Sequence, residues 1–144
     1  MQIDELTQIT EEVIKAFNHL MPQLTDIAPP TRDELEQIIA SPGCRLFLAS
    51  APDINGKIVG MASLASYRSP TGIHAWIEDV VVDTDYRGKG IGGAISLVAV
   101  EAAVTMGAKS ISLTSNPSRE AANRLYQRLG FVKWETNLYR YPMT

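Results

Sequence analysis

One stretch decides the fold of this chain: IEDVVVDTDYRGKGIGG, residues 77–93. It opens with three β-branched residues, Val80 to Val82, breaks at an acidic turn and passes through glycines into an apolar segment from Ala94 to Val104. A β-branched run favours a strand, and an apolar segment closed by Gly107 favours a helix. A strand, a glycine-rich loop and a helix in this order direct backbone N–H groups and a helix N-terminus at a phosphate. We therefore predict that a phosphorylated cofactor binds here.

The glycines of this loop fit two known patterns, and the first is the dinucleotide fingerprint G-x-G-x-x-G, which Gly88, Gly90 and Gly93 satisfy. In that fingerprint the first glycine follows its strand directly, whereas residues 83–87 intervene here. An acidic residue is also expected about 20 residues later, after the next strand, but the chain has Thr114-Ser115-Asn116 there. Long candidate strands also precede the loop, so it does not open a β-α-β unit. These features disfavour a dinucleotide site.

The second pattern is [Arg/Gln]-x-x-Gly-x-[Gly/Ala], which Arg87, Gly90 and Gly92 satisfy. It resembles the acetyl-CoA pyrophosphate loop of the GNAT superfamily of N-acetyltransferases. A second segment, REAANRLYQRLGF at residues 119–131, looks like the other hallmark of that superfamily, Ala-x-x-[Leu/Phe]-Tyr-x-x-x-Gly-Phe. One expected helix and one expected strand separate the two segments, as in that superfamily. A glycine pattern is weak evidence when it stands alone, but the two segments together are a specific signal.

One position of the second segment departs from the superfamily pattern. Where the superfamily often has an asparagine, seven residues before the tyrosine, this chain has Arg119. Asn123 shares a helical stripe with Arg119 and Tyr126, because residues three or four apart lie on one face of a helix. The resemblance therefore assigns the cofactor contact to Asn123, with Arg119 as the alternative.

Composition and charge indicate a single globular domain over residues 1–144. The net charge of −3 does not indicate a nucleic-acid-binding surface. Cys44 is the single cysteine, so it cannot form an internal disulfide, and no Cys and His residues have metal-binding spacing. The N-terminus lacks a signal-peptide pattern, and the apolar segment at 94–104 is too short to span a bilayer. We expect a cytoplasmic protein without a metal, nucleic-acid or membrane partner.

The order of elements predicts an α+β fold with a mixed, mostly antiparallel sheet that is flanked by helices. Asn55-Gly56 is a strong hairpin signal between two early strands. Gln2–Leu6 is a poor strand by propensity, and the β-rich tail Phe131–Pro142 is expected to form a hairpin that turns near Thr136-Asn137. We expect helices at residues 10–24, 31–40, 94–104 and 116–129, and strands at residues 45–50, 57–67, 73–82 and 110–114.

Acetyl transfer from a thioester to an amine needs a neutral amine, a donor to the carbonyl oxygen and an acid for the departing thiolate. The resemblance implies a splayed strand, in which the N–H of Val80 would contact the thioester carbonyl and that of Val82 the pantetheine. It also implies Glu78 as the base, acting directly or through water, and Tyr126 as the acid. The ordinary alternatives are that Glu78 is a solvated strand residue and that Tyr126 is a packed aromatic side chain. In a regular strand Glu78 and Asp79 point to opposite faces, so they are not a working pair.

The loop implied by the resemblance would bind the pyrophosphate with backbone N–H groups, while its two basic side chains screen the phosphate charge. Its residues are Arg87, Gly88, Lys89, Gly90, Ile91 and Gly92. Two further titratable residues, His19 and His74, have no partner that the sequence can name, so we interpret both as structural or exposed.

These features predict an N-acetyltransferase that transfers an acetyl group from acetyl-CoA directly to a primary amine of a small molecule or peptide. The alternative is a non-catalytic acyl-CoA-binding or sensor domain that keeps the loop without a productive acid and base. The IEDV run at residues 77–80 also resembles the glucosamine-phosphate acetyltransferase branch, although no basic cluster for a phosphosugar is evident. The acceptor would enter between residues 21–30 and 67–72, and the aromatic tail around Trp134 to Tyr141 could pair across a homodimer.

Overall fold

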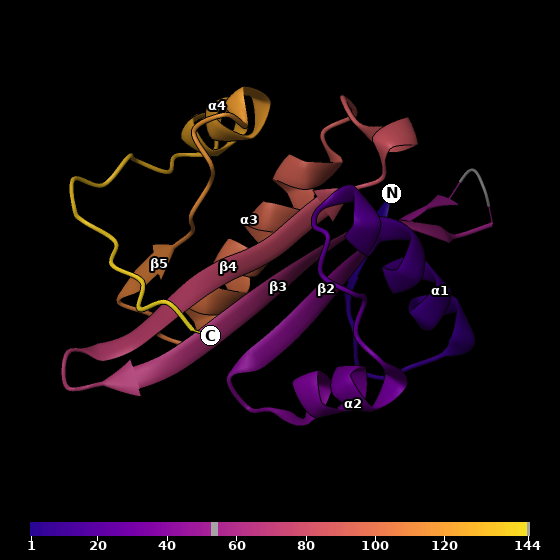
Figure 1. Ribbon diagram of the computed structural model, residues 1–144, viewed down its shortest axis with the longest axis horizontal. Coiled ribbons are helices and arrows are strands. Elements are labelled where there is room, and N and C mark those ends of the chain that lie inside the picture. The colour runs from indigo at the N-terminus through magenta and orange to yellow at the C-terminus, as the bar shows by residue number, and fades with distance from the viewer. Residues whose placement is uncertain (53–54, 144) are drawn as a thin grey trace. The chain divides into compact units, whose positions relative to one another are not determined.

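The computed structural model describes residues 1–52 and 55–143 of the chain (Figure 1). It forms two compact units, Met1–Thr114 and Ser115–Thr144, which are described in turn. Among the described residues, none of the helices combines the length and the apolar character needed to cross a bilayer.

A five-stranded sheet forms the centre of the first unit, with its strands in the order β1-β2-β3-β4-β5. The first four strands run antiparallel to their neighbours, and β5 is parallel to β4. This confirms the predicted mixed, mostly antiparallel sheet. The strands are β1 (Gln2–Glu5), β2 (Cys44–Ala51), β3 (Lys57–Ser69), β4 (Gly72–Val82) and β5 (Ser110–Ser112).

The first strand, β1, forms although its propensity is poor. It pairs with β2 from Gln2↔Ser50 to Glu5↔Phe47. Leu6 follows the strand, is buried, and donates its N–H to the Leu46 carbonyl at 2.7 Å. An edge strand needs few buried side chains of its own when ladder hydrogen bonds and a flanking apolar anchor hold it in register.

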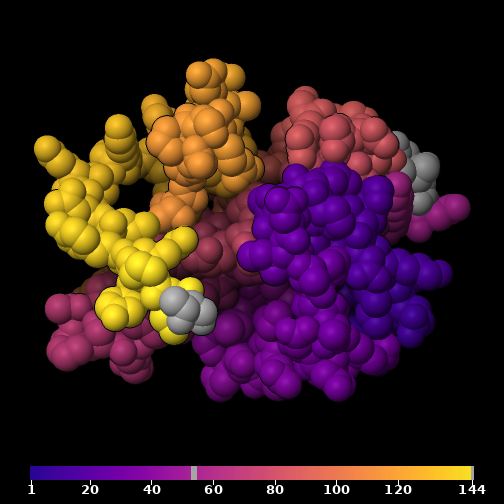
Figure 2. Space-filling model, viewed as in Figure 1, coloured from indigo at the N-terminus to yellow at the C-terminus, as the bar shows by residue number. Residues whose placement is uncertain are grey.

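Two helices cover one face of the sheet, and a threonine side chain caps the start of each. Helix α1 (Glu11–Leu20) begins after Thr10, whose hydroxyl accepts from the Val13 N–H, and continues as the 3₁₀ turn η1 (Met21–Gln23). Helix α2 (Arg32–Ala40) begins with the capping box of Thr31 and Glu34. Figure 2 shows these N-terminal segments, in indigo and purple, over the sheet. Their core contains Leu6, Ile9, Val13, Phe17, Leu20, Leu35, Leu46, Leu48, Met61 and Val81.

Helix α3 (Ile91–Thr105) lies on the opposite face of the sheet (Figure 1). It begins three residues earlier than predicted, directly after the glycine loop. Gly60 of β3 allows this close approach, because a Cβ built there would lie 3.3 Å from Cγ2 of Ile91 and 3.5 Å from Cβ of Ala49. Gly107, with φ of +81°, ends the helix as predicted. The start of α3 is therefore packed directly onto the sheet.

The turns between strands differ in part from the prediction. Asn55 and Gly56 have φ of 55° and 72°, the left-handed conformation expected of this pair. The turn between β3 and β4 is narrower than the predicted segment 68–72, because Ser69 already pairs with Gly72 and only two residues connect the strands. Residues 53 and 54 lie outside the described part of the chain.

The second unit contains helix α4 (Glu120–Arg128) and the tail that follows it. The helix begins later than predicted, because Asn116 accepts from the N–H and hydroxyl of Ser118 in a turn of its own and Arg119 is the N-cap. The predicted hairpin at residues 131–142 is wrong: no strand is found among residues 131–143. A two-stranded hairpin that packs against nothing is only marginally stable, and Trp134 and Tyr139 here are 79% and 87% exposed.

Candidate functional site

Strand β4 is irregular at the position of the predicted base. Its register with β3 changes from Ser63↔Glu78 to Met61↔Val81, so Asp79 and Val80 oppose a single residue. Asp79 has φ of 52°, which is uncommon for a residue with a Cβ and marks a β-bulge. The expectation that Glu78 and Asp79 point to opposite faces assumed a regular strand, and the bulge removes that assumption. Glu78 itself is exposed.

The ladder between β4 and β5 is short. It comprises His74↔Ser110, Ala75↔Ile111 and Trp76↔Ser112, whereas β4 continues to Val82. Strand β5 also ends two residues earlier than predicted. Within the described residues, the part of β4 from residue 77 to residue 82 therefore has no β5 partner along its edge. Val80 and Val82, the predicted backbone donors, both lie in this part of β4 and are half-buried.

The glycine loop follows β4 after one 3₁₀ turn, η3 (Thr84–Tyr86). Gly88 and Gly90 have φ of 78° and 81°, and Gly90 is the N-cap of α3. A Cβ at either glycine would meet no protein atom within 4 Å, so the left-handed backbone rather than packing requires glycine here. The first intrahelical bond runs from the Ala94 N–H to the Gly90 carbonyl. The N–H groups of the preceding helical residues are therefore available to a ligand.

Basic side chains surround the loop. Arg87 is exposed, and its Nε donates to the Val82 carbonyl at 3.0 Å. The Lys89 ammonium lies 5.1 Å from the centre of the Tyr86 ring, and the Lys57 ammonium lies 5.9 Å from it. Three cations thus lie around η3, and two of them, Arg87 and Lys89, belong to the loop that leads into α3, which favours an anionic ligand there. The sequence identified Arg87 and Lys89, but Lys57 reaches this place only through the pairing of β3 with β4.

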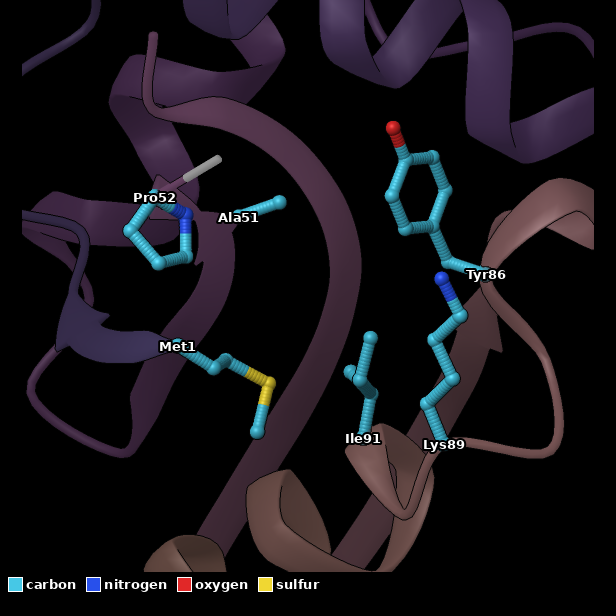
Figure 3. Close-up of a pocket in the computed structure, with 6 residues that line it drawn as sticks. All are labelled: Met1, Ala51, Pro52, Tyr86, Lys89 and Ile91. Atoms are coloured by element: carbon cyan, nitrogen blue, oxygen red, sulfur yellow. The ribbon is translucent and has the colours of Figure 1, made fainter. Parts of the chain in front are cut away.

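A small pocket lies on one side of the loop. In Figure 3 the side chains of Met1, Ala51 and Pro52 border an open space from one side, and those of Tyr86, Lys89 and Ile91 border it from the other. Its volume is about 140 Å³, less than the roughly 300–1,000 Å³ of typical small-molecule sites. The pocket is therefore too small to be the binding site of a whole nucleotide cofactor.

The turn before the loop is held by a polar group that the sequence did not reveal. Asp83 is only 1% exposed; its Oδ1 accepts from the Asp85 N–H at 3.1 Å, and its Oδ2 lies 2.9 Å from Nε2 of His19. Burial alone raises the pKa of Asp83, but the Asp85 and His19 hydrogen bonds and the charges of His19 and Lys57 outweigh it, so the pKa lies below its ordinary value. His19 and Asp83 are 64 residues apart, so no local pattern could have paired them.

Tyr126 of the second unit is 8% exposed and makes an edge-to-face contact with Phe131, with ring centroids 5.9 Å apart. Burial raises the pKa of its phenol, against the opposing effect of the Arg119 cation. The Asn123 amide donates to the carbonyls of Asn116 and Arg119, each at 2.9 Å. Both of its N–H groups thus hold the start of α4, which leaves its carbonyl oxygen as the group for a ligand contact.

The predicted site residues fall into two groups. Glu78, Val80, Val82 and the loop at residues 87–92 come together at the end of β4 in the first unit. Tyr126 and Asn123 belong to α4 in the second unit. Among the described residues, no group of three or more His, Cys, Asp or Glu side chains could hold a metal ion.

Comparison with known proteins identifies the family of the chain. The model of the acetyltransferase (GNAT) family matches residues 10–131. The glucosamine 6-phosphate N-acetyltransferase of Trypanosoma brucei brucei is 33% identical over 142 residues, which cover 93% of this chain and 92% of that protein. The mycothiol acetyltransferase of Renibacterium salmoninarum is 34% identical over 95 residues, 64% of this chain. The chain spans only 28% of the length of that relative.

The fold is also that of solved acetyltransferases. The structure of glucosamine-6-phosphate N-acetyltransferase from Arabidopsis thaliana superposes with a TM-score of 0.80 at 21% identity, covering 98% of this chain and 99% of that one. At this identity the likeness shows the fold, which is the GNAT acyl-CoA N-acyltransferase fold predicted from the two sequence segments.

Proposed function

Because the chain belongs to the acetyltransferase (GNAT) family, we propose that it transfers an acetyl group from acetyl-CoA directly to a primary amine of a small molecule or peptide. One observation carries this proposal: a loop with two left-handed glycines runs into the N-terminus of α3, beside the part of β4 that no longer pairs with β5. Such a loop presents N–H groups to a pyrophosphate, and an unpaired strand edge presents N–H and C=O groups to an extended ligand.

The residues present fit acetyl-CoA. A Cβ built on Gly88 or Gly90 would have no protein atom within 4 Å. A phosphate can therefore approach the backbone at these two glycines. The proposed pyrophosphate site comprises residues 87–92, with Arg87 and Lys89 as the nearby cations. Val80 and Val82 would donate their N–H groups to the thioester carbonyl and the pantetheine, and Asn123 would contact the cofactor through its amide oxygen.

Acetyl-CoA supplies the acetyl group as a thioester, whose sulfur leaves as a thiolate. Glu78 would accept the proton that the amine loses as its nitrogen bonds to the carbonyl carbon, directly or through a water molecule. Tyr126 would donate its phenolic proton to the sulfur as the carbon–sulfur bond breaks. A raised pKa keeps this phenol protonated at neutral pH, which is the state that an acid requires.

The relatives suggest where to look for the acceptor. The trypanosomal relative spans almost the whole chain, and its name specifies an amino sugar phosphate. The sequence showed no basic cluster for such a substrate, and Arg87 and Lys89 are already assigned to the pyrophosphate of the cofactor, so the similarity to this relative alone supports this acceptor. We therefore propose glucosamine 6-phosphate as the first acceptor to test, followed by amines without a phosphate.

Two further expectations complete the proposal. We propose that residues 1–144 act as one catalytic domain in the cytoplasm, because the family match runs from residue 10 to residue 131 across both units. We also propose that the exposed apolar tail pairs across a homodimer, because Trp134, Tyr139 and Tyr141 are each more than three-quarters exposed.

The deciding experiment is calorimetric titration with acetyl-CoA, CoA and NAD, followed by a thiol-release assay with glucosamine 6-phosphate and a panel of other amines. Binding of acetyl-CoA with thiol release for one amine is expected. Binding without turnover on every amine would favour the acyl-CoA sensor instead. Binding of NAD but not of acetyl-CoA would overturn the assignment of the loop.

A further inference from the structure

Two side chains, one at the end of α1 and one in η1, contact the turn that precedes the glycine loop. His19 Nε2 lies 2.9 Å from Asp83 Oδ2. Gln23 Oε1 accepts from both the N–H and the hydroxyl of Thr84, at 2.8 and 2.6 Å. The partners are 64 and 61 residues apart in the chain. Helix α1, on one face of the sheet, is thus linked to the end of β4.

These contacts provide hydrogen-bond acceptors for the first N–H groups of η3. A 3₁₀ turn of three residues cannot satisfy its own first N–H groups. The Thr84 N–H is bound by Gln23, and the Asp85 N–H is bound by Asp83 Oδ1 at 3.1 Å. Asp83 also donates its own N–H to the Val59 carbonyl at 2.8 Å. The carboxylate is therefore the cap of the turn that ends where the loop begins, at Arg87.

His19 is the side chain that keeps this buried carboxylate bonded on its second oxygen. A carboxylate only accepts, so Nε2 of His19 donates to it. Gln23 Nε2 lies 3.4 Å from the same ring nitrogen, but a donating nitrogen cannot also accept, so that amide donates to the His19 carbonyl at 3.3 Å. The Lys57 ammonium is more distant, at 3.9 Å from Oδ2. Without His19, a carboxylate that is 1% exposed would lose its short bond on Oδ2.

We propose that His19 is a positioning residue, which holds Asp83 and thereby fixes the conformation of η3 and the affinity of the loop at residues 87–92 for the cofactor. This rests on the proposed function of the loop as the acetyl-CoA site. His19 does not touch the reacting atoms, so its removal changes how tightly the cofactor is bound and leaves the chemical step intact. Helix α1 and the cofactor loop are linked to one another through this pair.

The test compares His19→Phe with His19→Gln. Phenylalanine keeps a ring of similar size without the donor, whereas the amide nitrogen of glutamine can occupy the position of Nε2. We expect His19→Phe to raise the Kd for acetyl-CoA about tenfold, since an unsatisfied buried acceptor costs roughly the 1.4 kcal/mol that corresponds to that factor. His19→Gln should restore most of the affinity. Turnover at saturating acetyl-CoA should stay within about twofold, because the lost interaction affects binding alone.

Two controls make the result specific. His74→Phe is the same change on β4, at a histidine bonded to Thr71 and Ser110, and it should leave the Kd unchanged. Asp83→Ala should weaken binding at least as much as His19→Phe, and adding His19→Phe to it should cause no further loss, because the pair is already absent.

Hydrogen exchange of the amides at residues 84–90 separates this inference from the function on which it rests. We expect faster exchange in His19→Phe and native rates in His19→Gln. If the native protein did not bind acetyl-CoA, the proposed function would fail, while this exchange pattern would still support the positioning role. Unchanged exchange, no rescue by glutamine, or a loss in turnover without a loss in affinity would overturn it.

Discussion

Position 90 requires glycine for two separate reasons. Its φ of +81° costs conformational energy for any residue with a Cβ. A side chain at this position would also project into the space in front of the helix N-terminus, where no protein atom lies within 4 Å of a built Cβ. A substitution there changes both the backbone strain and the ligand space, so a test of the loop needs two variants that share the strain and differ in charge.

We predict that Gly90→Asp abolishes measurable binding of acetyl-CoA. Gly90→Asn should also weaken binding, but its loss of affinity should be at least tenfold smaller than that of Gly90→Asp. Both side chains tolerate the left-handed region and can cap a helix, so the two variants should unfold at similar temperatures. Only aspartate adds a negative charge where the phosphate belongs. Calorimetry measures the two affinities and thermal unfolding measures the strain. Equal losses of affinity would show that the effect is one of conformation rather than of charge.

Tyr126 combines burial with a polar end, and its raised pKa suits a proton donor. We predict that Tyr126→Phe lowers kcat by about 100-fold, the usual contribution of one general acid, and changes the Kd for acetyl-CoA by less than about threefold. The edge-to-face contact with Phe131 does not need the hydroxyl, so stability should change little. Stopped-time thiol release and calorimetry give the two quantities. A loss confined to affinity would mean that the phenol is not the acid.

Strand β4 owes its shape to one residue in an unusual conformation. Asp79 has φ of 52° and, together with Val80, opposes a single residue of β3. The bulge turns the end of the strand, so that the exposed Glu78 lies before it and Val81 and Val82 lie after it. An acidic side chain in the left-handed region is tolerated because aspartate is short and polar, whereas a β-branched residue is not.

We predict that Asp79→Val lowers the free energy of unfolding by about 1–2 kcal/mol, the cost of a left-handed conformation for such a residue. Asp79→Gly should be neutral or stabilising, because glycine adopts this conformation freely. Denaturant unfolding of the three proteins gives the comparison without any assay of activity. A valine variant as stable as the native protein would mean that the strand can adopt a regular register.

The chain as a whole leaves its C-terminal tail unpaired among the described residues. Val132, Trp134 and Leu138 are 64–79% exposed, and the aromatic residues beyond them more so. A group of exposed apolar side chains favours contact with another apolar surface or strand edge. A second copy of the chain would supply such an edge.

We predict that the protein sediments as a dimer at about 100 µM, an ordinary concentration for a subunit contact of micromolar affinity, and that the double change Trp134→Glu and Tyr139→Glu yields a monomer. Val104→Glu is the control, because Val104 is 64% exposed on α3 outside the tail. Sedimentation equilibrium distinguishes the two states. A native protein that stays monomeric at this concentration would remove the dimer from the proposal.

Several features could be predicted from the sequence because they depend on residues close together in the chain. The capping box of Thr31 and Glu34 involves one helical turn, and the apolar face of α1 follows from its 3.6-residue period. The glycine loop was predictable for the same reason, since Gly88 and Gly90 adopt left-handed φ values that glycine alone reaches freely. The conformation of these two glycines is therefore determined largely by the residue type itself.

Other features were decided by contacts between distant segments. Strand β1 exists because β2 supplies its ladder, and the tail lacks a hairpin because nothing among the described residues pairs with it. The bulge at Asp79 depends on the register with β3. The pairing of His19 with Asp83 spans 64 residues and needs α1 to pack on the sheet. Local propensities are worth less than the hydrogen bonds and burial that such packing brings, so only the folded chain could reveal the residues that hold the loop in place.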